Sequence, residues 1–194
     1  MKRNIFLPLA TVLLGAFLPG NAACAVEEDS LIVPGERVGV VKLGMRAPEV
    51  KRDMGNIDGT YKLSSGVRLD FAQWKEPDRT YKIRLFYKGG KVVQVSESAP
   101  VPATADGISC RSTLGEVQAK YKGLVCLPFD GPEGRINYWA DRSRGIAFAF
   151  AVEKAESRNK DLAVQDNQRL SAIVVFPANG RLIPDKDERE GQVR

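Results

Sequence analysis

The sequence predicts an α+β fold of two tandem α-β-β-β repeats, in which helices pack on one face of antiparallel sheet. Three observations lead to this prediction. Two short helix-like segments lie 67 residues apart, three strand-like runs follow each of them, and a Gly-Gly pair separates two of these runs. Because four elements recur in the same order, the pattern indicates a duplicated unit.

The two helix-like segments share residue types at corresponding positions. At the offset of 67 residues, Glu49-Val50 falls on Glu116-Val117. Pro48 suits the first turn of the first helix, where its missing N–H costs nothing. Thr113 stands three residues before Glu116, which is the spacing of a capping box. Both segments are therefore predicted to begin as helices close to these positions.

The strand-like runs are rich in β-branched and aromatic residues and are bounded by turn residues. The dipeptide Gly89-Gly90 is typical of a two-residue β-hairpin turn, and residues 141–144 form a second expected turn. A polar stretch at 153–168 reads as a long loop. The predicted strands are residues 67–72, 81–88 and 91–97 in the first half, and 135–140, 145–152 and 170–176 in the second.

Residues 1–25 are typical of a secretory signal peptide. Lys2 and Arg3 precede an apolar run that ends at Leu18, and small residues follow a helix-breaking Pro-Gly pair. The alternative is a membrane anchor, but about 14 residues of helix span only roughly 21 Å of a ~30 Å hydrocarbon core. The remaining predicted divisions are a first repeat at 26–98, a Pro/Ala linker at 99–106, a second repeat at 107–178 and a charged flexible tail at 179–194.

Cysteine pairing depends on the cleavage point. Cleavage before Val26 removes Cys24 and leaves Cys110 and Cys126, which are then expected to form a structural disulfide in an oxidising compartment. Closing this loop of about 16 residues stabilises the fold by roughly 3 kcal/mol. The alternative is acylation of Cys24 as the first mature residue, although Asn21-Ala22-Ala23 is a poor lipobox.

The charge balance and the residue inventory exclude several classes of function. Removing residues 1–25 takes two basic residues and no acidic one from a formal net charge of +5, so the mature chain is too weakly basic to indicate a nucleic-acid binder. The chain has no histidine, which excludes histidine-dependent nucleophiles and histidine metal ligands. No phosphate-binding glycine loop is present. We therefore predict no cofactor, metal site or catalytic residue, with a carboxylate-pair glycan hydrolase as an alternative.

The predicted sheet has one face towards the helices and one open face. Alternation sends residues 81, 83, 85 and 87 towards the core, joined by residues 67, 69 and 71. In the second half, Phe148 and its alternating neighbours face the core, and an alanine row at 147, 149 and 151 lines the open face. The open face is interpreted as a partner-binding surface, and the alternative is a solvated face whose lysines prevent aggregation. Its candidate residues are Arg68, Lys82, Arg84, Phe86, Lys88 and Trp139, with Trp74 in a nearby turn.

The run Gly44-Met45-Arg46-Ala47-Pro48-Glu49-Val50, followed by a small antiparallel sheet, resembles a module found in exported proteins. It is similar to the tandem-repeat fold of the secreted β-lactamase inhibitor protein and to outer-membrane assembly lipoproteins of the BamE/SmpA type. The duplicated layout carries this resemblance over roughly residues 36–178. The resemblance implies a protein that works by binding other proteins and not by catalysis.

These observations together predict an exported, non-enzymatic protein-binding module of the periplasm or the secreted fraction. Its expected role is that of inhibitor, immunity factor or envelope-assembly accessory, and its expected partner is another exported or envelope protein, not nucleic acid. One alternative is a structural lipoprotein of the outer membrane anchored through Cys24. The other is a cell-wall glycan hydrolase that uses paired carboxylates.

Overall fold

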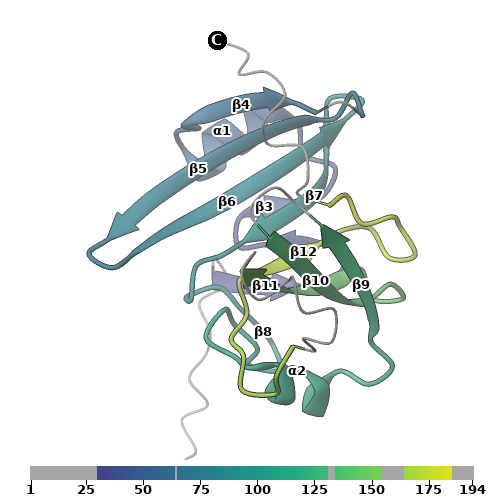
Figure 1. Ribbon diagram of the computed structural model, residues 1–194. Helices are drawn as coiled ribbons and strands as arrows, with labels where there is room; N and C mark the ends of the chain where they lie inside the picture. The colour runs from purple at the N-terminus through teal and green to yellow at the C-terminus, as the bar shows by residue number, and fades with distance from the viewer. Residues whose placement is uncertain (1–29, 64, 131–133, 154–163, 185–194) are drawn as a thin grey trace, which may run out of the picture.

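The computed structural model describes residues 30–63, 65–130, 134–153 and 164–184 (Figure 1). The expected signal peptide and Cys24 lie outside the described residues, as do residues 154–163 of the expected loop and 185–194 of the expected tail. Predictions about these segments therefore stay predictions.

The described residues form a large sheet, a small sheet and two short helices. The helices are α1 (Ala47–Met54) and α2 (Leu114–Lys120). The small sheet contains β1 (Leu31–Val33), β2 (Arg37–Val38), β3 (Val41–Lys42) and β8 (Ala103–Thr104). The large sheet contains β4 (Gly59–Lys62), β5 (Arg68–Glu76), β6 (Arg79–Lys88), β7 (Lys91–Glu97), β9 (Val125–Asp130), β10 (Gly134–Asp141), β11 (Ile146–Glu153) and β12 (Ala172–Val175).

The large sheet is continuous and antiparallel. Its strands follow the order β4-β5-β6-β7-β12-β11-β10-β9, so β4 and β9 are the two edges and β7 pairs with β12 in the middle. The small sheet has the order β3-β2-β1-β8, and β1 and β8 pair in parallel. Because β8 lies in the segment predicted as a linker, that segment also contributes a strand to the small sheet.

The six predicted strands are found with shifts of one or two residues at their ends, except that β5 extends four residues further than expected. Gly89 and Gly90 have φ angles of 59° and 76°, which a two-residue hairpin turn requires and which glycine adopts without steric cost. The capping box is also present, because the Glu116 N–H donates to Thr113 Oγ1 and the Thr113 N–H donates to Glu116 Oε2. Local sequence signals therefore positioned these elements correctly.

The predicted fold class is nevertheless wrong, because the described chain is mostly β. The two helices have only 8 and 7 residues. The first buries only Val50 and the second only Leu114 and Val117, which is too little apolar surface to cover eight strands. The predicted units of one helix and three strands are replaced by one continuous sheet, whose edge strands β4 and β9 were not among the predicted strands.

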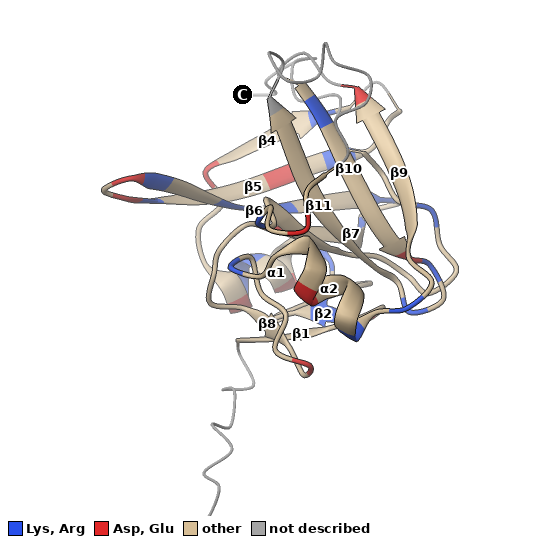
Figure 2. Cartoon of the chain, turned by 60° about the horizontal axis from the view of Figure 1, so that its bottom comes forward, with Lys and Arg blue, Asp and Glu red and all other residues tan. Residues whose placement is uncertain are grey.

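The small sheet packs on the part of the large sheet that the two helices leave uncovered. Ile32, Val38 and Val41 of this sheet join the main core cluster together with Val50 and Val117 of the helices. Figure 2 shows α1, α2 and the small sheet on the same side of the large sheet. The large sheet contributes alternate residues to this core, among them Ile83, Leu85, Val95, Phe148, Phe150 and Ile173.

The opposite face of the large sheet is also partly buried. A second cluster contains Tyr138, Ala147 and Phe176, and a third contains Leu69 and Phe86. The alanines at 147 and 149 therefore do not line an open face, because their relative exposures are 0% and 3%. The prediction that residues 67, 69 and 71 face the helices is also wrong, since Leu69 pairs with Phe86 and shares its face.

Residues 179–184, which we call the C-terminal strap, contribute to this second face. Leu182 packs into the second cluster and Ile183 packs against the third. The side chain of Gln94 bonds to both backbone groups of Ile183: its amide nitrogen donates to the Ile183 carbonyl at 2.8 Å, and its oxygen accepts from the Ile183 N–H at 2.8 Å. The first part of the predicted flexible tail is thus bound to the sheet.

Candidate functional site

The predicted partner-binding residues do not form one exposed surface. Phe86 is fully buried, with 0% relative exposure. Trp139 pairs with Phe148 across β10 and β11, so it lies on the core face and not beside the alanines. Its side chain is only partly exposed, and its indole N–H is buried without a hydrogen-bond partner. Two of the predicted anchor residues are therefore core residues.

Arg68 has a structural partner. Its guanidinium donates two hydrogen bonds of 2.7 Å to the carboxylate of Asp70, which is 1% exposed. Thr60 donates a third bond of 2.8 Å to the same carboxylate. Arg68 also lies over the ring of Tyr87, and burial raises the pKa of Tyr87 to about 12. Because the Asp70 carboxylate neutralises the charge of Arg68, Arg68 stabilises the sheet and is a weak candidate for partner binding.

Lys82 and Arg84 remain on the face opposite the helices. Arg84 lies directly opposite Phe71 on β5, and Lys82 lies opposite Gln73. The Phe71 ring stacks on Tyr61 of β4 at a centroid distance of 5.3 Å. Lys88 lies at the other end of β6, next to the hairpin turn, and is exposed. The basic residues are consequently spread along β6.

The predicted aromatic residue that remains exposed is Trp74, which lies on a projecting hairpin. The partner strands of β5 and β6 stop early: β4 pairs with β5 only as far as Phe71, and β7 pairs with β6 only as far as Ile83. Residues 74–81, which we call the arm, extend past these neighbours (Figure 1). Trp74 is 41% exposed, one of the few large apolar side chains in the described chain that reach the solvent.

The arm has an ordered aromatic side. Trp74 and Tyr81 pair across the strands with ring centroids 6.1 Å apart. Arg79 lies 5.8 Å from the centroid of the Tyr81 ring, and the Tyr81 hydroxyl donates to Glu76 at 3.2 Å. Figure 2 shows acidic and basic residues together at the tip. The arrangement holds the Trp74 ring in a defined orientation without burying it.

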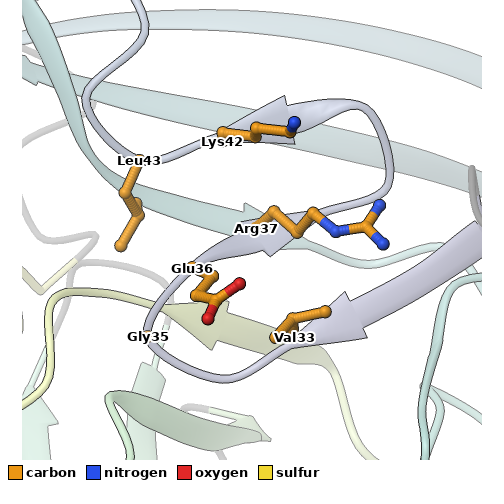
Figure 3. A pocket seen from close by; sticks show the side chains of 6 residues that line it. All are labelled: Val33, Gly35, Glu36, Arg37, Lys42 and Leu43. Carbon is orange, nitrogen blue, oxygen red and sulfur yellow. The ribbon is translucent and has the colours of Figure 1, made fainter.

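A separate pocket lies in the small sheet (Figure 3). Its volume is about 540 Å³, and its lining consists of Val33, Gly35, Glu36, Arg37, Lys42 and Leu43. Arg37 and Lys42 are directly opposite each other on β2 and β3. Figure 3 shows both cationic side chains extending in the same direction, with the Glu36 carboxylate on the other side of the Arg37 backbone. The pocket therefore combines two cations, one carboxylate and two apolar side chains.

The loop that lines this pocket is held tightly by the β10–β11 turn. The Gly35 N–H donates to the carbonyl of Gly145 at 3.2 Å. Gly35 has a φ of 72°, and a Cβ at this position would lie 2.8 Å from the Arg144 carbonyl oxygen. The Leu43 N–H donates to the Glu36 carbonyl at 2.7 Å. These contacts fix the backbone of the loop that lines the pocket.

The predicted Cys110–Cys126 disulfide is wrong, because both cysteines are free. The Cys110 thiol is buried and donates to the carbonyl of Glu97 on β7 at 3.3 Å. Cys126 lies on β9, four strand positions away in the sheet order. Strands β12, β11 and β10 lie between β7 and β9 in the sheet, so the two thiols have different surroundings.

Glu97 is a buried carboxyl group beside Cys110. It is 3% exposed, and its Oε1 accepts from the Ala99 N–H at 2.5 Å. Burial raises the pKa of Glu97 to about 7 and that of Cys110 to about 12. A glycosidase needs two carboxyl groups facing one cleft, whereas the neighbour of Glu97 is a thiol inside the core. Within the described ranges, no group of three Cys, Asp or Glu residues is arranged to hold a metal ion.

Two features of the candidate site were absent from the sequence-based prediction. The pocket depends on residues 33–43, which were outside the predicted strands, although the basic residues at 37 and 42 flank a short Val-rich turn that suggests a hairpin. The arm was missed because strand β5 was expected to end at residue 72. The apolar alternation of Leu69 and Phe71 does not continue past residue 71, because Gln73 and Lys75 follow on the same face, so no local pattern indicated the extension.

No helix in the described part of the chain is long and apolar enough to cross a membrane. The sequence matches no protein family model, and no curated protein matches it significantly. The comparisons therefore provide no support for membership in the inhibitor or assembly-lipoprotein families.

Solved structures provide a fold-level comparison. The chain is similar to the uncharacterized protein yfeY from Escherichia coli, with a TM-score of 0.51 and 16% identity over 74% of this chain and 98% of that one. Two weaker similarities each have a TM-score of 0.42 and 9% identity. The first covers 75% of this chain and 48% of a cysteine-rich secretory protein from Staphylococcus aureus. The second covers 74% of this chain and 51% of an extracellular protein with an SCP domain from Bacillus anthracis. These two are too distant to bear on function. The first similarity shows that the chain shares the fold of yfeY.

Proposed function

We propose that the chain is an exported binding protein that engages another exported or envelope protein through the arm. The observation that carries this proposal is the exposed ring of Trp74 on a hairpin that extends past its neighbouring strands. Tryptophan, tyrosine and arginine are the residues that most often dominate binding energy at interfaces. The arm contains all three: Trp74 and Arg79 are exposed, and the buried Tyr81 lies against both.

The internal contacts of the arm favour this use. Tyr81 is only 7% exposed, so it supports the Trp74 ring from below, and Arg79 and Glu76 hold Tyr81 in place. An anchor that is already ordered loses little conformational freedom on binding. The partner expected here has an apolar pocket for the indole and carboxylates near it, which would meet Lys75 and Arg79.

Export and the absence of catalysis are part of the proposal. The N-terminal 25 residues have the order of a signal peptide. The chain lacks histidine, and its most perturbed carboxyl group, Glu97, lies inside the core. Binding without turnover is the role that agrees with these observations.

Affinity capture with the mature chain tests the role of the arm. The wild-type chain is immobilised and exposed to envelope extract, and each captured protein is then purified and titrated alone. Trp74→Ala is expected to weaken binding at least tenfold, because an interface tryptophan typically contributes 2 kcal/mol or more. Val101→Ala is the control, since Val101 is 66% exposed but lies outside the arm. Equal affinity of the Trp74→Ala and wild-type chains would exclude the arm as the docking site.

A further inference from the structure

Strand β9 is the less protected of the two edges of the large sheet. Among the described strands it pairs only with β10, and Figure 2 shows it at one side of the sheet. Residues 123–129 include no charged residue, and Val125 is 56% exposed. The other edge strand, β4, has four residues and ends at the exposed Lys62. An exposed apolar edge without charged residues is a template for pairing with another strand.

The hydrogen bonds of the sheet determine which backbone groups of β9 point outward. In an antiparallel sheet both backbone groups of a residue point to the same side, and the side alternates along the strand. The Ser171 N–H donates to the Ala149 carbonyl, so Ala149 points to β12 and the adjacent Phe148 points to β10. Trp139, the partner of Phe148, therefore points to β11. Cys126, the partner of Trp139 on β9, consequently directs its N–H and C=O away from the sheet.

Pro128 points outward as well, because it lies two residues after Cys126 on the same strand. This is the orientation in which a proline leaves the ladder to β10 intact, since it has no N–H to donate. Pro128 also restricts the register of any strand added at this edge. Pairing centred on Pro128 would lack both N–H groups at its middle, whereas pairing centred on Cys126 keeps both bonds of Cys126 and uses the Pro128 carbonyl as an acceptor.

We propose that β9 pairs antiparallel with β9 of a second copy of this chain, about a two-fold axis at Cys126. In this register Val125 lies opposite Leu127 of the second copy on one face of the sheet. On the other face Leu124 lies opposite Pro128 of the second copy. Both kinds of cross-strand pair are apolar, so they remove exposed apolar surface from water as the strands pair.

Charge and symmetry agree with an antiparallel pair of identical strands. Asp130 is the one charged residue of β9, and the register places it opposite Lys122 of the second copy. Both have partners in their own chain, Arg135 at 2.8 Å and the Gln118 carbonyl at 2.9 Å, so they add little attraction. A parallel in-register pair would instead place Asp130 beside Asp130 of the second copy. A two-fold pair uses the same edge of both chains, so it closes as a dimer and does not extend into a fibre.

Sedimentation equilibrium of the mature chain tests the dimer. Wild type is expected to dimerise reversibly at concentrations up to about 100 μM. Val125→Lys places a charge opposite Leu127 of the second copy and should raise the dissociation constant at least tenfold. Val101→Lys, at a 66% exposed position outside β9, is the matched control and should dimerise like wild type.

The same measurement separates this interface from the arm. Trp74→Ala should dimerise like wild type, because the β9 pair does not use the arm. A monomeric wild type, an unchanged dissociation constant in Val125→Lys, or loss of the dimer in Trp74→Ala would overturn the proposal.

Cys126 reports the register without a substitution in β9. Opposite residues of a hydrogen-bonded antiparallel pair have Cα atoms about 5.5 Å apart, which a disulfide can span. Diamide, which takes up the two electrons and two protons of the thiols, should therefore link Cys126 to Cys126 of the second copy, and peptide mass spectrometry identifies the link. Cys110 is buried and should stay reduced.

A displaced thiol is the control for random collision. In Cys126→Ser/Val101→Cys the exposed thiol lies outside β9, so disulfide-linked dimers should form at least tenfold more slowly than in wild type. Sedimentation of this variant should still show the dimer, because backbone bonds hold it together. Equal rates of linking in the two chains would contradict the Cys126 register.

Discussion

Glu97 shows how one side chain can couple stability to pH. It lies at the end of β7 between Ile83 of β6 and Ile173 of β12, so its carboxyl group has apolar neighbours on both sides. The charged form is poorly solvated there, and burial raises the pKa from 4.5 to about 7. The backbone N–H of Ala99 only partly offsets this effect. The Glu97 carboxyl group therefore keeps its proton in the native state up to about neutral pH.

The sign of the resulting pH dependence follows from the two pKa values. Between pH 4.5 and 7 the native state keeps a proton that the unfolded state releases, so the stability contributed by protonated Glu97 is lost as the pH rises through this window. The full difference corresponds to about 3 kcal/mol. Glu97→Gln cannot ionise, so we expect it to be more stable than wild type at pH 8 by about this amount and similar to it at pH 4.

Urea unfolding at a series of pH values measures this effect. The wild-type midpoint should fall between pH 5 and pH 8, and the Glu97→Gln midpoint should fall much less. Asp78→Asn, in the exposed turn of the arm, serves as a control that should retain the wild-type slope. Parallel pH profiles for wild type and Glu97→Gln would contradict the assignment.

At the scale of elements, the edge strand β4 is held to the sheet by an unusual cross-strand pair. Gly59 lies directly opposite Phe71, and the Phe71 ring lies over it: a Cβ at Gly59 would be 2.7 Å from the ring Cζ. The ring also stacks on Tyr61. The glycine is thus needed for the close approach of an aromatic ring, and its φ angle is not the reason.

Replacing this glycine should therefore loosen the edge through steric overlap. Gly59→Ala is expected to destabilise the protein by about 1–3 kcal/mol, the typical cost of overpacking. In a Phe71→Leu background the same substitution should cost much less, because the smaller side chain leaves room for the methyl group. A double-mutant cycle from urea unfolding measures the coupling. Additive costs would show that Gly59 is required for another reason.

At the scale of the whole molecule, the C-terminal strap contacts the middle of the large sheet. Gln94 on β7 and Ile183 are 89 residues apart in sequence and exchange two hydrogen bonds. Gln94 is 2% exposed, so these bonds satisfy an amide that would otherwise be buried without partners. Leu182 and Ile183 contact different apolar clusters. The strap therefore connects the two apolar clusters on the face of the large sheet opposite the helices.

Truncation tests this link. Removing residues 182–194 should destabilise the fold by about 3 kcal/mol, because it exposes two apolar side chains and leaves Gln94 without its partners. Removing residues 185–194 alone keeps Leu182 and Ile183 and serves as the reference for the longer truncation. Gln94→Ala should be costly in the full chain and nearly neutral after truncation at residue 182. Equal costs of Gln94→Ala in both backgrounds, measured by urea unfolding, would show that the strap and Gln94 act independently.

Local signals in the sequence were sufficient for individual elements. The Gly89-Gly90 turn, the Thr113 capping box and the six strand-like runs depend on neighbouring residues only, so periodicity and turn chemistry identify them. The same signals failed at the arm and at β4, because nothing local shows how far a strand extends past its neighbours. The pocket was missed for a related reason, since its short strands are stabilised by tertiary pairing.

Face assignments and the cysteine pairing failed because they depend on tertiary neighbours. Alternation shows that Leu69 and Arg68 lie on opposite faces, but it cannot show which face is covered by which layer. Here both faces are partly buried, which places Phe86 and Ala147 in cores where an open surface was predicted. Likewise, 16 residues separate Cys110 from Cys126 in the sequence, whereas the sheet order separates their surroundings by four strands.

The sequence by itself determined the positions of both helices and of six strands, the main turns, the signal-peptide pattern and the absence of histidine. These properties depend on residues that are adjacent in the chain or on composition. Only the tertiary structure decided that the eight strands form one sheet, that the small sheet and the strap pack on its faces, and that Trp74 is exposed on the arm. The physical reason is that burial is a property of contacts between distant segments, and one chain's local pattern is compatible with several such arrangements.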